Sequence, residues 1–308
     1  MKILFTGASS FTGYWFVKML ANKNHEVYAT FTQDNNKQYQ GIRFQRVKKV
    51  LKICNPVWNC KFGKKNFINI IEKEKFDILC HHAADVTNYK RSDFNYLEAI
   101  NKNTCSIMQV INALQQTKCN TVILTGSVFE QYEGCGSKPL RAFSPYGLSK
   151  GLTFDIFRYY TQINNIKLGK FVIPNPFGPF EEQRFTSYLI KTWKAGKVPK
   201  LKTPRYIRDN IHVSLLAMVY SYFVDKVFND SSFFQKINPS GYAGSQEAFT
   251  EKFAKEIRKR MNMDCKFESD NQKDFAEPAI RINKDVATQI ITNWDENKAW
   301  NDLAKYYM

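Results

Sequence analysis

Long apolar runs are missing from this chain of 308 residues. No stretch approaches the ~20 consecutive apolar residues that a membrane-spanning helix needs. The apolar run near the N-terminus is also too short for a signal peptide. We therefore expect a soluble, cytoplasmic protein that does not insert into membranes. Apolar residues still make up 44% of the chain, which is ample for a core.

The cysteine and histidine residues also lack the spacing that is typical of metal sites. The seven cysteines form no C-x-x-C pair, and none of them has a histidine at the spacing of a metal site. His81 and His82 are adjacent at the end of an expected strand, so their side chains point to opposite faces. We therefore expect reduced thiols and no metal site.

Acidic residues are scarce, with 28 Asp and Glu against 45 Lys and Arg, for a formal charge of +17. Such a field attracts phosphate-bearing ligands, and it also favours nucleic acid. The lysines are scattered rather than gathered in a stripe with aromatic residues, so we interpret most of them as solvated surface. Nucleic-acid binding stays open as an alternative function.

What the chain does contain is a strand, a glycine turn and a helical pattern at its N-terminus. The apolar run of residues 3–5 leads directly into the turn of residues 6–13. A helix that begins after such a turn offers unpaired N–H groups and the positive end of its dipole to a pyrophosphate. The dinucleotide fingerprint has glycine where Ser10 stands between Gly7 and Gly13, so the match is partial.

Strand-like and helical segments then alternate along the chain. Alternation of this kind predicts an α/β fold with a Rossmann-type, doubly wound parallel sheet, in which Gly7, His82 and Thr125 share one edge. A less regular, mostly helical C-terminal region predicts a smaller substrate lobe. We expect a Rossmann domain at 1–175 and a substrate lobe at 176–308, with some later segments returning to the first domain. The expected strands are 2–5, 26–31, 42–47, 77–81, 121–125 and 167–173, and the expected helices are 15–20, 106–116, 185–195, 212–228 and 246–261.

A candidate acid/base pair stands in the middle of the chain. Tyr146 and Lys150 place a phenol and an ammonium one helical turn apart. A free phenol has a pKa near 10, and a neighbouring positive charge favours the phenolate. Tyr14 and Tyr222 also precede a lysine by four residues, but only Tyr146 follows a Ser-Pro pair and the hydroxyl-bearing strand end at Thr125.

Taken together, these motifs resemble the extended short-chain dehydrogenases/reductases, the NAD-dependent epimerase/dehydratase family, which acts largely on nucleotide-activated sugars. The resemblance spans nearly the whole chain. It implies a nicotinamide cofactor, a nucleotide-sugar substrate and a homodimer. The segments that carry it are 6–13, 82–84, Asn101, 125–130, 146–150, 174–179 and 208–213.

The resemblance also implies residue roles. Tyr146 would be the acid/base, and Lys150 would hold the nicotinamide ribose and lower the pKa of the tyrosine. Thr125 would bind the reacting sugar oxygen, with Ser127 as second choice. The substrate residues would be Thr125, Tyr146, Asn175 and Arg208, the last two at the diphosphate. The cofactor residues would be Gly7, Ser10, Phe11, Thr12, Gly13, Thr32, Ala83, Ala84, Asn101, Lys150 and Ile173.

Besides Ser10, two expected cofactor positions and one pair of catalytic positions depart from the family pattern. Phe31 stands where an acidic residue would bind the adenosine ribose, which favours NADP over NAD slightly. The residues that could approach a 2′-phosphate are Thr30, Thr32, Lys37 and Arg43. Lys52 stands where an aspartate usually faces adenine. The Asp-Glu pair of family dehydratases is replaced by Gly126 and Ser127, so we do not expect a 4,6-dehydratase.

The function expected from the sequence is therefore hydride transfer at one carbon of a nucleotide sugar. The enzyme would be a 4-epimerase or a 4-keto-sugar reductase. The alternatives are a reductase of a non-sugar carbonyl and a relative whose cofactor site is altered and which binds nucleic acid.

Overall fold

Seven parallel strands form the central sheet of the protein, in the order β11-β7-β5-β4-β1-β2-β3. This confirms the expected Rossmann-type sheet. The computed structural model describes residues 1–308. The strands are β1 (Lys2–Thr6), β2 (Glu26–Thr30), β3 (Asn55–Val57), β4 (Ile78–His81), β5 (Thr121–Ser127), β7 (Lys167–Ile173) and β11 (Phe234–Ile237).

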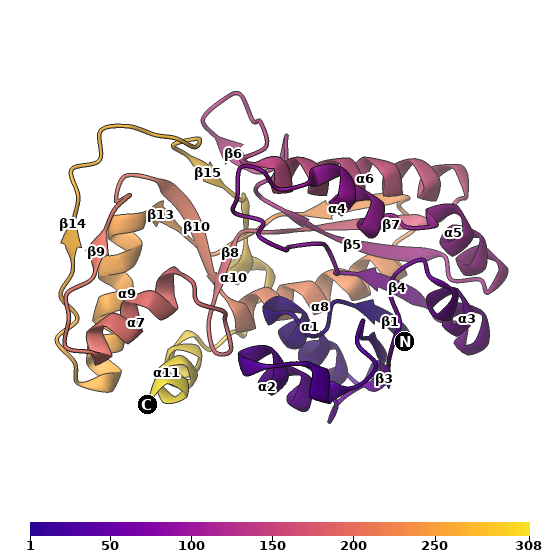
Figure 1. The fold of residues 1–308 in the computed structure, drawn as a ribbon, viewed down its shortest axis with the longest axis horizontal. Coiled ribbons are helices and arrows are strands. Elements are labelled where there is room, and N and C mark those ends of the chain that lie inside the picture. The colour runs from indigo at the N-terminus through magenta and orange to yellow at the C-terminus, as the bar shows by residue number, and fades with distance from the viewer. The chain divides into compact units, whose positions relative to one another are not determined.

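Helices cover both faces of this sheet (Figure 1). On one face, Phe16 of α1 stacks on Tyr220 of α8 with ring centroids 4.0 Å apart. On the other face, Val110, Leu114 and Phe157 belong to a large apolar cluster. The helices are α1 (Phe11–Asn22), α2 (Gly41–Val50) and α8 (Val213–Asn229) on the first face, and α3 (Lys65–Glu74), α4 (Tyr96–Asn103), α5 (Ile107–Gln116) and α6 (Pro145–Ile163) on the second; a short 3-10 helix, η1, spans Asn36–Gln38.

The strand expected at residues 42–47 is wrong, because this segment lies inside helix α2. Ile42 and Phe44 alternate with polar residues as they would in a strand. The buried apolar positions, however, are Val47 and Val50, one helical turn apart, and Lys48 and Lys49 stabilise the carbonyl end of the helix. The third strand is the short β3 that follows, paired with β2.

The chain divides into two units. Unit 1 contains the parallel sheet and comprises residues 1–133, 141–173 and 217–237, so it takes back most of α8 and strand β11. Unit 2 comprises residues 134–140, 174–216 and 238–308. No helix of either unit is long and apolar enough to span a membrane.

Unit 2 is organised around a three-stranded sheet in which β10 (Ile207–His212) is central. It pairs in parallel with β8 (Asn175–Phe177) and antiparallel with β13 (Tyr242–Ser245). Phe177, Phe253 and Trp300 belong to its apolar cluster. The helices of this unit are α7 (Phe185–Lys194), α9 (Gln246–Met261), α10 (Ala287–Ile290) and α11 (Glu296–Tyr307). The remaining short strands are β6 (Cys135–Gly136), β9 (Lys200–Leu201), β12 (Pro239–Ser240), β14 (Glu268–Ser269), β15 (Arg281–Ile282) and β16 (Asp285–Val286).

Candidate functional site

The glycine turn after β1 packs tightly against the segment that follows β4. Gly7 has a φ of +83°, and a Cβ on it would lie 2.9 Å from the backbone nitrogen of Ala83. A Cβ on Gly13 would lie 2.2 Å from the carbonyl oxygen of Gly7. The Thr6 hydroxyl accepts the N–H groups of His82 and Ala83, at 3.0 and 2.9 Å. Both glycines are therefore required by close backbone approach.

Ser10, which replaces the middle glycine of the fingerprint, satisfies its hydroxyl within the turn. It is the N-cap of α1, where its Oγ accepts the N–H of Gly13 at 3.1 Å. The same Oγ donates to the carbonyl oxygen of Gly7 at 2.8 Å. A serine is thus accommodated in a turn that still presents the N-terminus of α1, as a pyrophosphate site requires.

His82 joins three strand ends and is a residue that the sequence analysis did not assign to the site. Its Nε2 lies 3.1 Å from both the Ser10 and the Thr12 hydroxyls, and its Nδ1 lies 3.0 Å from the Thr125 hydroxyl. Burial lowers its pKa to about 3, so the ring is neutral at physiological pH. Since the Ser10 proton goes to Gly7, we assign the ring proton to Nε2. Nδ1 then accepts from Thr125.

The candidate acid/base pair lies on the first turns of α6. Ser144 caps this helix by accepting the N–H of Gly147 at 3.3 Å, and Pro145 occupies its first turn. The Lys150 Nζ donates to the carbonyl oxygen of Thr125 at 2.5 Å. Burial lowers the pKa of Lys150 to about 8. The half-buried Tyr146 ring packs against Tyr89, with centroids 5.2 Å apart.

Of the two hydroxyls expected at the end of β5, only Ser127 is accessible. Thr125 is 4% exposed, and its hydroxyl faces His82. Ser127 is half-buried two residues further on, on the same face of the strand. Its Oγ accepts the N–H of Phe129 at 3.2 Å. The Ser127 hydroxyl is therefore the better placed of the two to donate to a ligand.

An aromatic residue, Phe31, follows β2 where a carboxylate was the family expectation, and two arginines of α2 lie nearby. Phe31 is 1% exposed and stacks on Trp58, with centroids 4.6 Å apart. Arg43 reaches the glycine turn, where its Nε and Nη2 donate to the Ser9 hydroxyl at 3.0 and 2.8 Å. Arg46 donates to the Ser9 carbonyl oxygen at 3.0 Å. Helix α2 thus brings positive charge to the turn.

The other expected cofactor residues occupy varied positions. Phe11 and Thr12 are buried in the first turn of α1, Thr32 is exposed after β2, and Ala83 and Ala84 are half-buried after β4. Ile173 is half-buried at the end of β7, where its carbonyl oxygen accepts the N–H of Val128 at 3.0 Å.

Asn101 is exposed on α4, whereas Asn103 is buried. The Asn103 Oδ1 accepts the N–H of Asp85 at 2.9 Å, and its carbonyl oxygen lies 3.2 Å from the Nε2 of His81. Asn103 therefore supports the segment after β4, and the sequence analysis missed it. Counting helical turns along α4 from its buried Ala99 would have favoured Asn103 over Asn101.

The two expected diphosphate residues lie in unit 2, on neighbouring strands. The Asn175 side chain donates to the Asp209 carbonyl oxygen at 3.2 Å. Arg208 is 6% exposed, and its Nη1 donates to the carbonyl oxygens of residues 207, 278 and 279. Its Nη2 lies 3.1 Å from the carboxylate of Glu277, which is half exposed. A diphosphate at Arg208 would compete with Glu277.

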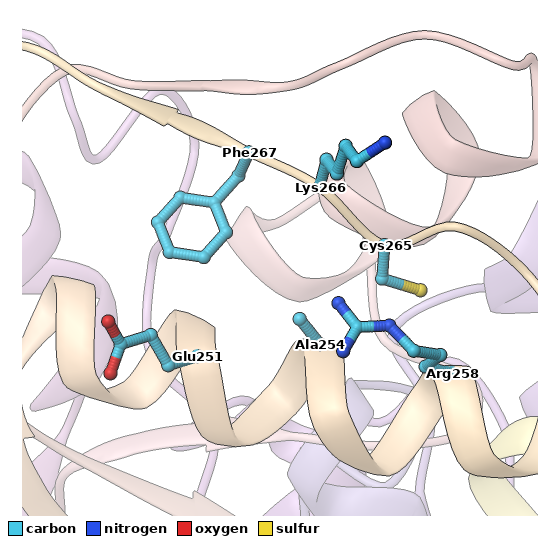
Figure 2. A pocket seen from close by; sticks show the side chains of 6 residues that line it. All are labelled: Glu251, Ala254, Arg258, Cys265, Lys266 and Phe267. Carbon is cyan, nitrogen blue, oxygen red and sulfur yellow. The ribbon is translucent and has the colours of Figure 1, made fainter.

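A separate hollow of about 320 Å³ in unit 2 lies between α9 and the segment 265–267. Figure 2 shows Arg258 extended toward Cys265, with Glu251 and Phe267 at the other end. Burial raises the pKa of the Cys265 thiol to about 11, so this thiol is not reactive at neutral pH. None of the expected site residues lines this hollow.

The family model of the NAD dependent epimerase/dehydratase family matches residues 3–233 of the chain. No curated protein matches it in sequence. Among solved structures, it resembles UDP-glucose-4-epimerase from Stenotrophomonas maltophila with bound NAD and formylated UDP-arabinopyranose. The identity is 14% and the TM-score is 0.77, with 100% of this chain and 98% of that chain covered.

Two further solved structures resemble it over almost their whole length. UDP-glucose 4-epimerase from Brucella ovis, in complex with NAD, has 14% identity and a TM-score of 0.76, with 99% and 98% of the two chains covered. The UDP-Glc/GlcNAc 4-epimerase from Campylobacter jejuni has 19% identity and a TM-score of 0.71, with the same coverage. At these identities the likeness shows a shared fold.

Replacing Gly7 should destabilise the protein more than replacing another glycine of positive φ. We expect Gly7→Ala to cost about 3 kcal/mol, from left-handed strain and overpacking against Ala83. Gly41→Ala is the control, because Gly41 has a φ of +54° and no atom within 4 Å of the added Cβ. It should cost only ~1 kcal/mol. Denaturant unfolding measures both, and equal losses would contradict the close approach described here.

Proposed function

Because the chain belongs to the NAD-dependent epimerase/dehydratase family, we propose that it transfers a hydride between a nicotinamide and one carbon of a nucleotide-activated sugar. The observation that carries this proposal is the pair of Tyr146 and Lys150 on α6, with the Lys150 ammonium on the Thr125 carbonyl at the end of β5. A bound nicotinamide would supply or accept the hydride at the sugar carbon.

In this proposal Tyr146 moves the proton that accompanies the hydride. When a keto sugar is reduced, the Tyr146 hydroxyl donates its proton to the oxygen that becomes a hydroxyl. When a sugar hydroxyl is oxidised, the phenolate takes that proton back. The buried Lys150 ammonium favours the phenolate because an opposite charge stabilises it. Lys150 therefore has to remain protonated while the reaction proceeds.

Ser127 rather than Thr125 supplies the second hydroxyl in our proposal. Thr125 is the first choice from the sequence. With the ring proton of His82 assigned to Nε2, however, the Thr125 hydroxyl donates its hydrogen bond to Nδ1 of His82. Ser127 is the next residue on the same face of β5 and is half-buried. We assign to it the hydrogen bond to the reacting sugar oxygen, and to Thr125 the support of Lys150 through its carbonyl.

We propose NADP(H) as the cofactor, in contrast to the NAD bound in two of the solved epimerases. A carboxylate after β2 would repel a 2′-phosphate, and Phe31 holds that position buried in an aromatic cluster. Arg43 of α2 hydrogen-bonds to Ser9 of the glycine turn, and its Nε and Nη2 would be two donors for the phosphate. A reductase must exchange its cofactor in every turnover, so this preference favours a 4-keto-sugar reductase.

The 4-epimerase remains the second candidate, because solved 4-epimerases share the fold over the whole chain. An epimerase retains its cofactor through the cycle. A 4,6-dehydratase is disfavoured by packing as well as by sequence. A side chain on Gly126 would place its Cβ 2.9 Å from the Cε of Lys170 and 3.0 Å from the Oε1 of Glu130. A side chain at residue 126 would therefore have to displace the Lys170 and Glu130 side chains from their ion pair.

In unit 2, we propose that Arg208 and Asn175 bind the diphosphate of the substrate. The Arg208 guanidinium is held by carbonyl oxygens on one side and meets Glu277 on the other. Glu277 would have to release Nη2 when a diphosphate binds. The homodimer stays a prediction, and exposed apolar side chains on α5 and α6 (Met108, Tyr159 and Ile163) give it a surface.

Tyr146→Phe should lower turnover by at least ~10²-fold, since the variant lacks the proton donor. NADPH oxidation in the presence of 4-keto nucleotide sugars, and interconversion of UDP-glucose and UDP-galactose, measure this loss. Tyr222→Phe, at an exposed position on α8 that also precedes a lysine by four residues, is the matched control and should retain activity. Wild-type turnover in Tyr146→Phe would contradict the proposed mechanism.

Arg43→Ala should weaken NADPH binding about tenfold and leave NADH binding nearly unchanged, because only NADPH carries the 2′-phosphate. Quenching of tryptophan fluorescence measures both affinities. Lys48→Ala removes an exposed charge at the other end of α2 and serves as control. Tightly retained NAD in the purified protein would support the epimerase instead. Binding of neither cofactor would favour the nucleic-acid alternative.

Arg208→Ala and Glu277→Gln should change the affinity for UDP in opposite directions. The first removes charge-assisted donors and should weaken binding about tenfold or more. The second removes a competing carboxylate and should strengthen binding. Calorimetric titration measures both, with Glu268→Gln, an exposed acid in the same unit, as control. Weaker binding in both variants would argue against a diphosphate at Arg208.

A further inference from the structure

Four charged side chains form a connected network next to β5, inside unit 1. The Lys170 Nζ lies 2.7 Å from a carboxylate oxygen of Glu130 and 2.7 Å from one of Glu133. Glu133 also pairs with Lys236 at 3.1 Å. The first three side chains are at most 5% exposed, whereas Lys236 is 35% exposed. The network therefore runs from the interior to the surface.

Glu130 couples this network to the end of β5. Its Oε1 accepts the backbone N–H of Ser127 at 2.7 Å, while Oε2 faces Lys170. Both oxygens thus face donors, as an ionised carboxylate requires. Gly126 leaves the space that the Lys170 stem and the Glu130 carboxylate fill. Glu130 therefore fixes the backbone of the residue to which we assign the substrate hydrogen bond.

The network is costly to bury, which argues that it does more than hold the fold together. Two charges taken out of water rarely regain in attraction more than they lose in solvation, and apolar residues of the same volume are often as stable. Lys170 lies on the face of the sheet that α6 covers, with its Nζ 3.8 Å from the centroid of the Phe154 ring. An apolar side chain there would pack against Phe154 without any charge to compensate.

The charged groups around Lys150 include two members of this network. Glu130, from the loop after β5, raises the pKa of Lys150, and Lys170, from β7, lowers it. His81 and His82, at the end of β4, also face Lys150 but are neutral, since burial lowers their pKa values to about 3. Burial raises the pKa of the Glu130 carboxyl, and the ammonium groups of Lys170 and Lys150 oppose that rise. Once Glu130 is ionised, the charge environment of Lys150 is set mainly by Glu130 and Lys170.

We propose that Glu130 and Lys170 are positioning residues for the Tyr146–Lys150 pair: they fix the end of β5 and set the charge environment in which Lys150 holds its proton. The inference rests on the proposed roles of Tyr146 and Lys150. Glu130 keeps Lys150 charged in a buried site, so the ammonium persists where it must stabilise the phenolate. Glu133 and Lys236 in turn compensate the charge of Lys170 toward the surface.

Titration of Lys150 in the cofactor-free protein tests this directly. The isotope-labelled ε-carbon of Lys150 is followed by NMR against pH, and its resonance is identified by its loss in Lys150→Arg. Glu130→Gln should lower the midpoint by about one pH unit, because an opposite charge is removed. Lys170→Gln should raise it, because a like charge is removed. Glu133→Gln, equally buried but farther along the network, should leave it near the wild-type value.

Shifts of opposite sign in Glu130→Gln and Lys170→Gln distinguish an electrostatic role from a structural one. If the substitutions only loosened the site, the Lys150 titration midpoint would move in the same direction in every variant. An unchanged midpoint in Glu130→Gln, or shifts of the same sign in Glu130→Gln and Lys170→Gln, would overturn the proposal. If Glu130→Gln does not fold, the sign of the Lys170→Gln shift decides. The titration needs neither cofactor nor substrate, so its outcome is independent of the Tyr146→Phe turnover that tests the proposed function.

Discussion

The close approach of the glycine turn to the segment after β4 is the constraint on which the site in unit 1 depends. Gly7 and Ala83 come within a distance that no side chain at residue 7 allows, and the Thr6 hydroxyl holds the N–H groups of His82 and Ala83 in place. With these backbones fixed, the imidazole of His82 spans from the start of α1 to β5. Three strand ends then form one rigid edge.

Buried charge is the second organising principle of this edge. Lys150 sits on α6 with its ammonium on a carbonyl oxygen, and its proton is held against the cost of burial. The nearby carboxylate of Glu130 opposes that cost, and Lys170 limits its effect. In the proposed function, this arrangement keeps the buried Lys150 protonated, so that its charge can stabilise the Tyr146 phenolate.

The same network bears on which reactions the site can perform. Lys170 and Glu130 occupy the space beside Gly126, so the acids that a dehydratase carries here would displace their side chains. In the proposed function, chemistry at a single sugar carbon needs one proton and one hydride, and Tyr146 would move the proton. The proposed preference for NADP(H) rests on Arg43 and on the buried Phe31.

Several elements of the fold and site are readable from the chain because they depend on local spacing. The glycine turn, the parallel strands and the Tyr146–Lys150 interval are of this kind. The strand predicted at 42–47 is wrong because the alternation of Ile42 and Phe44 fits a strand and a helix equally. Only the buried face, with Val47 and Val50, distinguishes the two. Asn101 and Asn103 likewise differ in which turn of α4 faces the interior.

By itself, the sequence determined the family, the strand, glycine turn and helix at the N-terminus, and the placement of Tyr146 and Lys150 one turn apart on a helix. Only the tertiary structure decided that the Thr125 hydroxyl forms a hydrogen bond with His82 and that Arg208 forms an ion pair with Glu277. It also decided that Glu130 and Lys170 form an ion pair near Lys150. The physical reason is that hydrogen bonds and charge pairs depend on distances between strands and loops far apart along the chain, which residue spacing within one segment does not encode.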